Sequence, residues 1–179
     1  MNILLLLGTI WPVPGNNTNI IMKLVPYLKK ENHSIEILAV APQAGIFAEE
    51  GLPERIEDTP IHWAIDNRKD FIRKLIIPGL SRIIDRNGFS DAFQAMLMIR
   101  EAIALHKCFP YDAVIASMEP YYAGYVASCL RQKYKKVVYL MDPPGYICDE
   151  NNTTAFRERN LKKIFETCVV LTTPFIRDA

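Results

Sequence analysis

Polar residues follow two apolar segments of this chain at the points where the segments end. Ser117 and Glu119 come directly after the run 113–116, and Asp142 follows the run 137–140. In an open parallel sheet, ligands bind in the crevice outside the carboxyl ends of the strands. A carboxylate in that crevice can orient a hydroxyl group, accept a proton or balance a developing positive charge. We therefore predict that Asp142 is catalytic and that Ser117 and Glu119 bind substrate.

Two prolines follow Asp142 and stiffen the backbone around it. Tyr146 closes the same segment and is a further candidate for binding substrate. Aspartate before proline is also a common turn former or helix cap, and Glu119 likewise precedes a proline. A purely structural role for both carboxylates therefore stays open.

The segment 8–17 is a second candidate site, because it contains two glycines and two prolines that cannot continue the preceding strand. Gly15 allows a backbone to approach a ligand closely, and the free N–H groups of the next helix can bind a phosphate or a sugar hydroxyl. We predict that Gly15, Asn16 and Asn17 bind substrate. The alternative is an ordinary turn between a strand and a helix.

A basic segment, residues 69–86, carries five basic and two acidic side chains together with an apolar side. Such a segment can lie on an anionic membrane surface or hold an anionic acceptor. It can equally be an ordinary amphipathic helical pair with a solvated basic face. The first interpretation would place the protein peripherally at the inner face of a membrane, and both stay open.

Strand-like and helix-like segments alternate along the chain. The strand-like segments are continuous in apolar residues, which is typical of parallel strands covered on both faces. We therefore predict an α/β fold with a doubly wound, mainly parallel, Rossmann-like sheet of about six strands in the order 3-2-1-4-5-6. The expected strands are 3–7, 35–40, 61–65, 113–116, 137–140 and 168–171, and the expected helices are 18–31, 70–77, 80–86, 90–107, 120–134 and 154–166.

The first expected helix contains two local signals. Asn32 directly follows the helix 18–31, and asparagine is the commonest substitute for glycine in a left-handed helix cap. Pro26 falls inside the helix and is expected to bend it or to shift its start.

The composition is that of a globular protein. The 179 residues suffice for one well-cored α/β domain but not for two of ordinary size. The 21 Lys and Arg against 20 Asp and Glu leave a net charge of +1, so no global field attracts nucleic acid. The four cysteines are widely spaced, which favours reduced thiols, and the sequence shows neither a signal peptide nor a membrane span. We expect a cytoplasmic protein.

Several common chemistries lack their motifs in this sequence. There is no GxGxxG after the first strand, no GK[ST] phosphate loop, no GxSxG elbow and no HExxH. The three histidines are scattered and have no metal-ligand spacing. The sequence therefore indicates neither a bound dinucleotide nor a metal.

The segment YDAVIASMEPYYAGYVA, followed by KKVVYLMDPPGY, is similar to a subgroup of the family 4 glycosyltransferases (glycosyl transferases group 1) of the GT-B fold. In that subgroup the fourth strand ends in Ser-x-Pro-Pro and the fifth in Asp-Pro-Trp, and Ser117, Pro120, Asp142 and Pro143 fall on this pattern. The opening strand, loop and helix and the later segment CVVLTTPF also resemble the N-terminal domain of this family. The resemblance covers nearly all of the chain, although Pro144 stands where the family has an aromatic residue.

The resemblance implies a two-domain enzyme that moves a sugar from a nucleotide diphosphate sugar to a glycan or lipid-linked acceptor. The transfer would retain the configuration and would need no metal or other cofactor. Residues 1–179 would form the acceptor-side N-terminal domain, and the partner that completes the enzyme would be a C-terminal donor-binding domain. The fragment alone is expected to be inactive.

A stand-alone α/β binding or regulatory module with a transferase-like fold is the alternative. A reading frame that continues for another domain would favour the enzyme, and a stop codon after Ala179 would favour the module. The sequence leaves open the sugar, the nucleotide, the acceptor and the oligomeric state.

Overall fold

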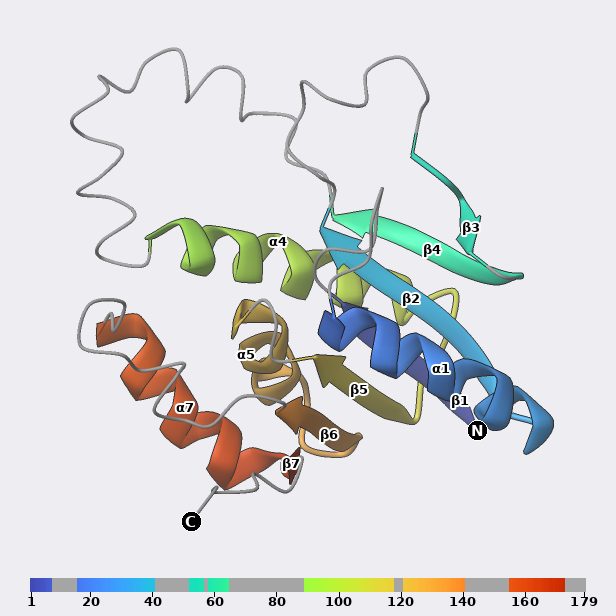
Figure 1. Cartoon of the computed structure of the whole chain (residues 1–179). Helices are drawn as coiled ribbons and strands as arrows, with labels where there is room; N and C mark the ends of the chain where they lie inside the picture. Colours follow the sequence, from blue (N-terminus) through green and yellow to red (C-terminus); the bar gives the residue numbers. More distant parts are fainter. Residues whose placement is uncertain are drawn as a thin grey trace.

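A computed structural model gives the fold of the chain (Figure 1). It describes residues 1–7, 16–40, 52–56, 58–64, 89–117, 121–140 and 155–172. The strands are β1 (Asn2–Leu7), β2 (Ser34–Val40), β3 (Arg55–Ile56), β4 (Thr59–Ala64), β5 (Ala113–Ser117), β6 (Lys135–Leu140) and β7 (Val169–Thr172). The described helices are α1 (Asn16–Lys30), α4 (Phe89–Leu105), α5 (Tyr121–Cys129) and α7 (Ala155–Thr167).

The strands form one sheet in the order β3-β4-β2-β1-β5-β6-β7. Every neighbouring pair is parallel except β3 and β4, which are antiparallel. The six parallel strands follow the predicted order 3-2-1-4-5-6, so the doubly wound α/β fold is confirmed. The additional strand β3 was not predicted, because two residues are too few to form a recognisable sequence pattern.

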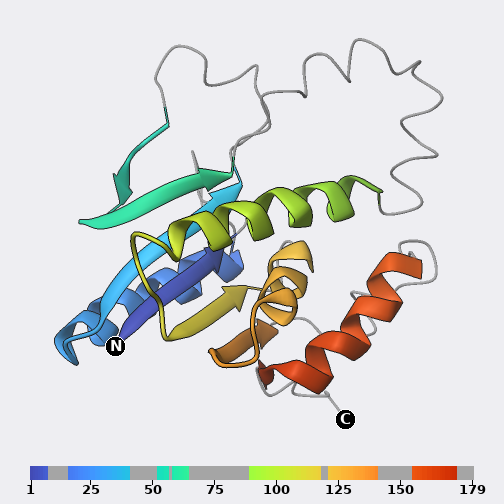
Figure 2. The ribbon, with the colours of Figure 1, turned by 180° about the vertical axis from the view of Figure 1, so that it is seen from behind.

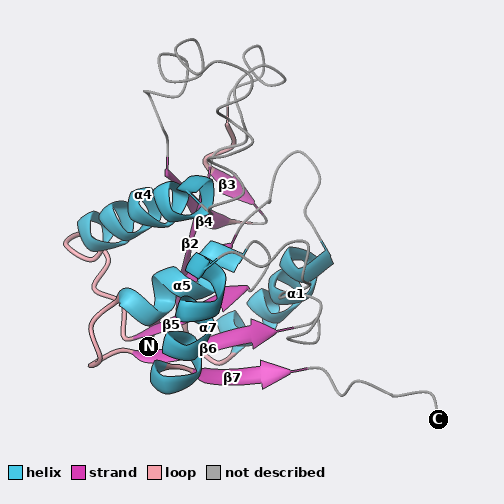
Figure 3. Cartoon of the chain, turned by 90° about the vertical axis from the view of Figure 1, so that its left-hand side faces the viewer, coloured by secondary structure: helices cyan, strands magenta, loops and turns pink. Residues whose placement is uncertain are grey.

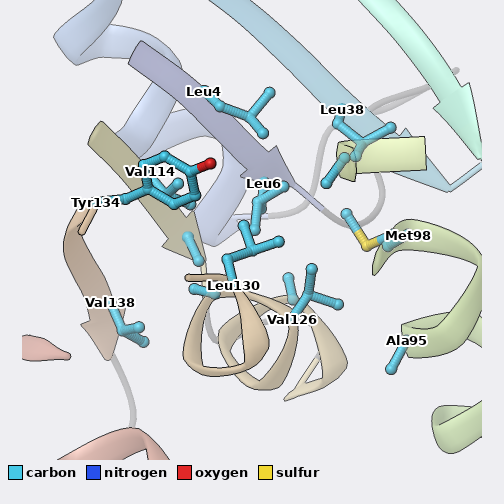
Figure 4. Packing of buried hydrophobic residues seen from close by; sticks show 14 of the residues in the cluster. Leu4, Leu6, Leu38, Ala95, Met98, Val114, Val126, Leu130, Tyr134 and Val138 are labelled. Carbon is cyan, nitrogen blue, oxygen red and sulfur yellow. The ribbon is translucent and has the colours of Figure 1, made fainter. Parts of the chain in front are cut away.

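Helices cover both faces of the sheet. Figures 1 and 3 show α1 on one face and α4, α5 and α7 on the other, and Figure 2 shows the latter face from the front. In β1, Leu4 and Leu6 belong to the hydrophobic cluster under α4, α5 and α7 (Figure 4), whereas Ile3, Leu5 and Leu7 pack toward α1. This two-sided burial explains why the strand is apolar at successive positions.

The described elements begin and end within two residues of the predicted bounds, except at the end of one helix. The prediction of a helix over 120–134 was wrong in length, because α5 ends at Cys129. Leu130 and Tyr134 leave the helical path and are buried in the core at 6% and 8% exposure, respectively. Their burial ends the helix and turns the chain into β6. The predicted helices 70–77 and 80–86 lie outside the described residues.

A buried lysine stabilises the end of α5. Lys136 is only 5% exposed, and its Nζ donates to the carbonyl oxygens of Leu130 at 2.7 Å and Ser128 at 3.4 Å. A cation at this position satisfies carbonyl groups that the helix leaves free and interacts favourably with the negative end of the helix dipole. Burial is the main reason why the pKa of Lys136 lies below its usual range.

Helix α1 runs through Pro26 and ends in a left-handed turn at Asn32, whose φ is 58°. The N–H of Asn32 donates to the carbonyl of Lys29 at 3.0 Å, and that of His33 donates to the carbonyl of Leu28 at 3.1 Å. These two bonds form a Schellman motif. The predicted left-handed cap at Asn32 is therefore confirmed.

Replacing Asn32 by alanine is expected to lower the free energy of unfolding by about 1 kcal/mol, because an ordinary Cβ disfavours the left-handed region. Asn32→Gly should be at least as stable as the wild type. Urea denaturation of the three proteins measures both effects. Equal stability of the alanine and glycine variants would show that Asn32 is not held in a left-handed conformation in solution.

Candidate functional site

Three adjacent strands end side by side at the carboxyl edge of the sheet. In the pairing of β1 with β5, Leu6 faces Ala116, so Leu7 and Ser117 end these strands at the same level. In the pairing of β5 with β6, Ser117 faces Tyr139, one residue before the end of β6. Neighbouring strands lie about 4.8 Å apart. The strands β1, β5 and β6 therefore all end at one edge of the sheet.

The helices that follow these strands begin at the same edge (Figure 1). Helix α1 starts at Asn16 and α5 at Tyr121, and neither has an acidic residue in its first turn. The first N–H groups of a helix have no partner within the helix, and the helix dipole makes this end positive. The carboxyl edge can therefore receive an anionic group without repulsion from acidic side chains in these two turns.

The structure places three of the predicted site residues, Asn16, Asn17 and Ser117, at this edge. Asn16 and Asn17 are the first two residues of α1, so their backbone N–H groups have no partner within the helix. Ser117 is the last residue of β5, is fully buried and has an interaction partner. The sheet therefore brings the segments 16–17 and 117 to a common edge, as the sequence predicted.

The remaining predicted site residues lie outside the described part of the chain. These are Gly15, Glu119, Asp142 and Tyr146, together with the basic segment 69–86. Their roles therefore stay predictions. Two tyrosines that follow Glu119 in the sequence, Tyr122 and Tyr125, are partly buried against the core cluster, as expected for packing residues.

A pocket of about 300 Å³, which the sequence did not reveal, lies between the end of α4 and the strands β2 and β4. Inside it, His62 Nε2 lies 2.7 Å from Glu36 Oε2, so the two side chains are in hydrogen-bond contact. The other lining residues are Glu101, Ala104, Leu105, Cys108 and Phe109. Because α4 runs against the direction of the strands, its C-terminal end lies away from the carboxyl edge. The pocket is thus separate from the predicted site.

The sequence contains part of the signal for the contact between Glu36 and His62. Glu36 interrupts the apolar run of β2, and such a polar residue in a buried strand needs a partner. The partner is 26 residues away, and it becomes a neighbour because β2 pairs with β4 in a register that places Leu38 opposite His62. Single-sequence patterns do not provide that register.

Two further findings concern the described ranges alone. Within them, no three His, Cys, Asp or Glu side chains are grouped closely enough to hold a metal ion. Nor does any helix in the described ranges combine the length and the apolar character needed to cross a bilayer.

No protein-family model matches the chain, and no curated protein matches it. Among solved structures, similar folds include the spinosyn rhamnosyltransferase SpnG, alone and with thymidine diphosphate, at 14% identity and TM-scores of 0.45 and 0.43. The SsfS6 glycosyltransferase of Streptomyces sp. SF2575 is 17% identical, with a TM-score of 0.43.

The matches cover most of this chain but a minor part of each neighbour. They span 81% of the chain and 36% of SpnG, and 78% of the chain and 39% of SsfS6. The chain therefore spans well under half the length of these enzymes. Similarities of this size assign no activity to it.

Proposed function

We propose that this chain is the acceptor-side half of a retaining glycosyltransferase of the GT-B fold, and that the whole enzyme is similar to the family 4 glycosyltransferases. The enzyme would move a sugar from a nucleotide diphosphate sugar to a glycan or lipid-linked acceptor. The observation that carries the proposal is the alignment of β1, β5 and β6, whose carboxyl ends lie together. The three segments with the family-like residues follow these ends, and ligands of open parallel sheets bind in this crevice.

The chemistry of this edge suits an anionic sugar donor. A nucleotide diphosphate carries negative charge, which the positive N-terminal end of a helix stabilises. The first turn of α1 contains Asn16 and Asn17 and has no acidic residue. In the proposal, Gly15 and these two residues lie against the donor phosphates or the acceptor.

The proposed catalytic group is Asp142, which follows β6 by two residues. Its carboxylate would lie near the reacting sugar, where it could orient a hydroxyl group or balance developing positive charge. Ser117, Glu119 and Tyr146 would contribute substrate contacts. The donor-binding C-terminal domain would supply the remaining contacts to the nucleotide.

The proposal is tested with the full-length protein, a panel of nucleotide sugars and the variant Asp142→Asn. We expect the wild type to release nucleotide from one donor and the variant to lose about 100-fold or more in kcat. The fragment 1–179 should release none. Measuring nucleotide release with and without acceptor follows the reaction directly.

Asp112→Asn is the matched control for this experiment. Asp112 lies before β5, at the opposite edge of the sheet, where its Oδ2 accepts a hydrogen bond from the backbone N–H of Asn2 at 2.9 Å. The same change of charge there should leave turnover nearly unchanged. Full turnover of Asp142→Asn would remove Asp142 from the site. Absence of any nucleotide release by the full-length protein would support a binding or regulatory module instead.

A further inference from the structure

Two thiols and two amines gather where the end of α5 meets α7 and the edge of the sheet. Cys129 is the last residue of α5, Lys163 lies on α7, and Cys168 directly precedes β7. Lys136, on β6, interacts electrostatically with all three of these groups. The cluster lies near the amino ends of β6 and β7 and is not part of the proposed sugar-transfer site.

Cys129 and Lys163 are in direct contact. Lys163 Nζ donates to Cys129 Sγ at 3.2 Å, although the residues are 34 positions apart in the sequence. The Tyr125 ring lies 5.4 Å from the same Nζ and holds the amine over its face. Both residues are only partly buried. A partly exposed thiol therefore lies at contact distance from a positioned amine.

The other two members of the cluster are less suited to react. Lys136 is buried and its Nζ is engaged by the carbonyl oxygens that end α5. Cys168 contacts the hydroxyl of Thr167 at 3.6 Å, and burial raises the pKa of its thiol. Because the thiolate is the reactive form, this environment makes Cys168 a poor nucleophile.

We propose that Cys129 and Lys163 form an oxidation-dependent modification site, in which a hydroperoxide converts the contact into a covalent sulfur–nitrogen bond. In the first step, the Cys129 thiolate attacks a peroxide oxygen, the O–O bond breaks, and a sulfenic acid and water (or an alcohol) result. In the second step, the Lys163 ammonium gives a proton to water, and the resulting amine attacks this sulfur. The S–O bond breaks, one amine proton goes to the departing oxygen, and water leaves. Thiol sulfur is oxidised and the peroxide is reduced.

The bond would join the end of α5 to α7. These helices follow β5 and β6, and the segments that lead into them carry Glu119 and Asp142. Cross-linking would therefore fix α5 relative to α7, the two helices that these site segments precede. This consequence rests on the proposed function, whereas the modification itself does not.

The test is mass spectrometry of the purified full chain, reduced first and then treated with hydrogen peroxide. We expect the wild type to lose two hydrogen atoms, about 2 Da, in a product that dithiothreitol reverses. Trypsin should no longer cleave after Lys163, and a peptide that joins Cys129 to Lys163 should appear. A mass gain without a cross-linked peptide would overturn the proposal.

Four variants separate the sulfur–nitrogen bond from a disulfide. Cys129→Ser and Lys163→Arg should both abolish the cross-linked peptide, whereas Cys168→Ser should retain it. Lys162→Arg is the matched control, because Lys162 is the neighbouring lysine and its Nζ lies 3.9 Å from Glu166 on the exposed surface. It should behave as the wild type.

A bond between Cys129 and Cys168 that persists in Lys163→Arg would overturn the proposal. Circular dichroism of each variant before oxidation establishes that a lost cross-link does not reflect a lost fold. Because the readout is a mass, failure of this proposal and failure of the proposed sugar transfer are independent results.

Discussion

Replacing Leu6 by alanine is expected to lower the free energy of unfolding by about 3–5 kcal/mol. Leu6 has no exposed surface and lies on β1, the central strand of the sheet. It belongs to the cluster that also contains Val126 of α5, Leu130 directly after that helix and Met98 of α4 (Figure 4). Strands on both sides limit how far the surroundings can collapse into the cavity. Urea denaturation followed by circular dichroism measures the loss.

Leu24→Ala is the control for this prediction, because it removes the same atoms from a residue that is 42% exposed. Leu24 lies on α1, where alanine also has a favourable helix propensity, so the loss should stay below about 1 kcal/mol. Similar losses at the two positions would contradict the central place of β1 in the core.

The second large effect is a loss of folding stability at high pH, which we expect from Tyr111. This residue is 2% exposed, and its hydroxyl donates to the carbonyl oxygen of Ala102 at 3.2 Å. Burial, reinforced by the neighbouring Tyr134, raises the pKa of Tyr111 to about 12. In the unfolded chain a tyrosine has a pKa of about 10. The folded state therefore keeps a proton that the unfolded chain releases in this interval.

Because the pKa of Tyr111 is higher in the folded than in the unfolded chain, its contribution to stability falls as the pH rises. Below pH 10 both states are protonated and the stabilisation is fully present, whereas between pH 10 and about 12 the stability falls as the pH rises. The contribution of Tyr111 should decrease by about 2–3 kcal/mol over this range, at about 1.4 kcal/mol for each pKa unit. Tyr111→Phe cannot titrate and should lack this contribution.

The difference in unfolding free energy between the wild type and Tyr111→Phe isolates this residue from all other groups that titrate at high pH. At pH 8 the variant should be less stable by about 1 kcal/mol, the usual net value of one hydrogen bond. Near pH 12 the order should reverse. A difference that stays constant from pH 8 to 12 would show that Tyr111 does not ionise during unfolding.

Much of the fold could be predicted because its signals are local. The uninterrupted apolar residues of β1 indicate a strand covered on both faces, and the two clusters divide its side chains in that way. Asn32 after an amphipathic segment indicates a left-handed cap, and its φ is 58°. The α/β alternation, with right-handed crossovers, then leaves few possible strand orders. The observed order of the parallel strands is the simplest of them.

The end of α5 could not be predicted in this way. The sequence after Cys129 still has helix-compatible residues, but Leu130 and Tyr134 turn into the core. The buried Lys136 then satisfies the carbonyl oxygens of Ser128 and Leu130. These contacts depend on where β6 returns to the sheet, and no local propensity encodes that position.

The same distinction between local signals and tertiary contacts applies to the candidate site. The sequence alone determined which segments carry chemistry-bearing residues and, through the parallel strand order, that β1, β5 and β6 end at one edge of the sheet. Only the tertiary structure decided two side-chain contacts. Glu36 contacts His62, 26 residues away, and Lys163 contacts Cys129, 34 residues away. Periodicity reports which face of an element is buried, because it arises from the geometry of a single helix or strand. Contacts between distant side chains depend on strand register and helix packing, which arise only when the whole core is assembled.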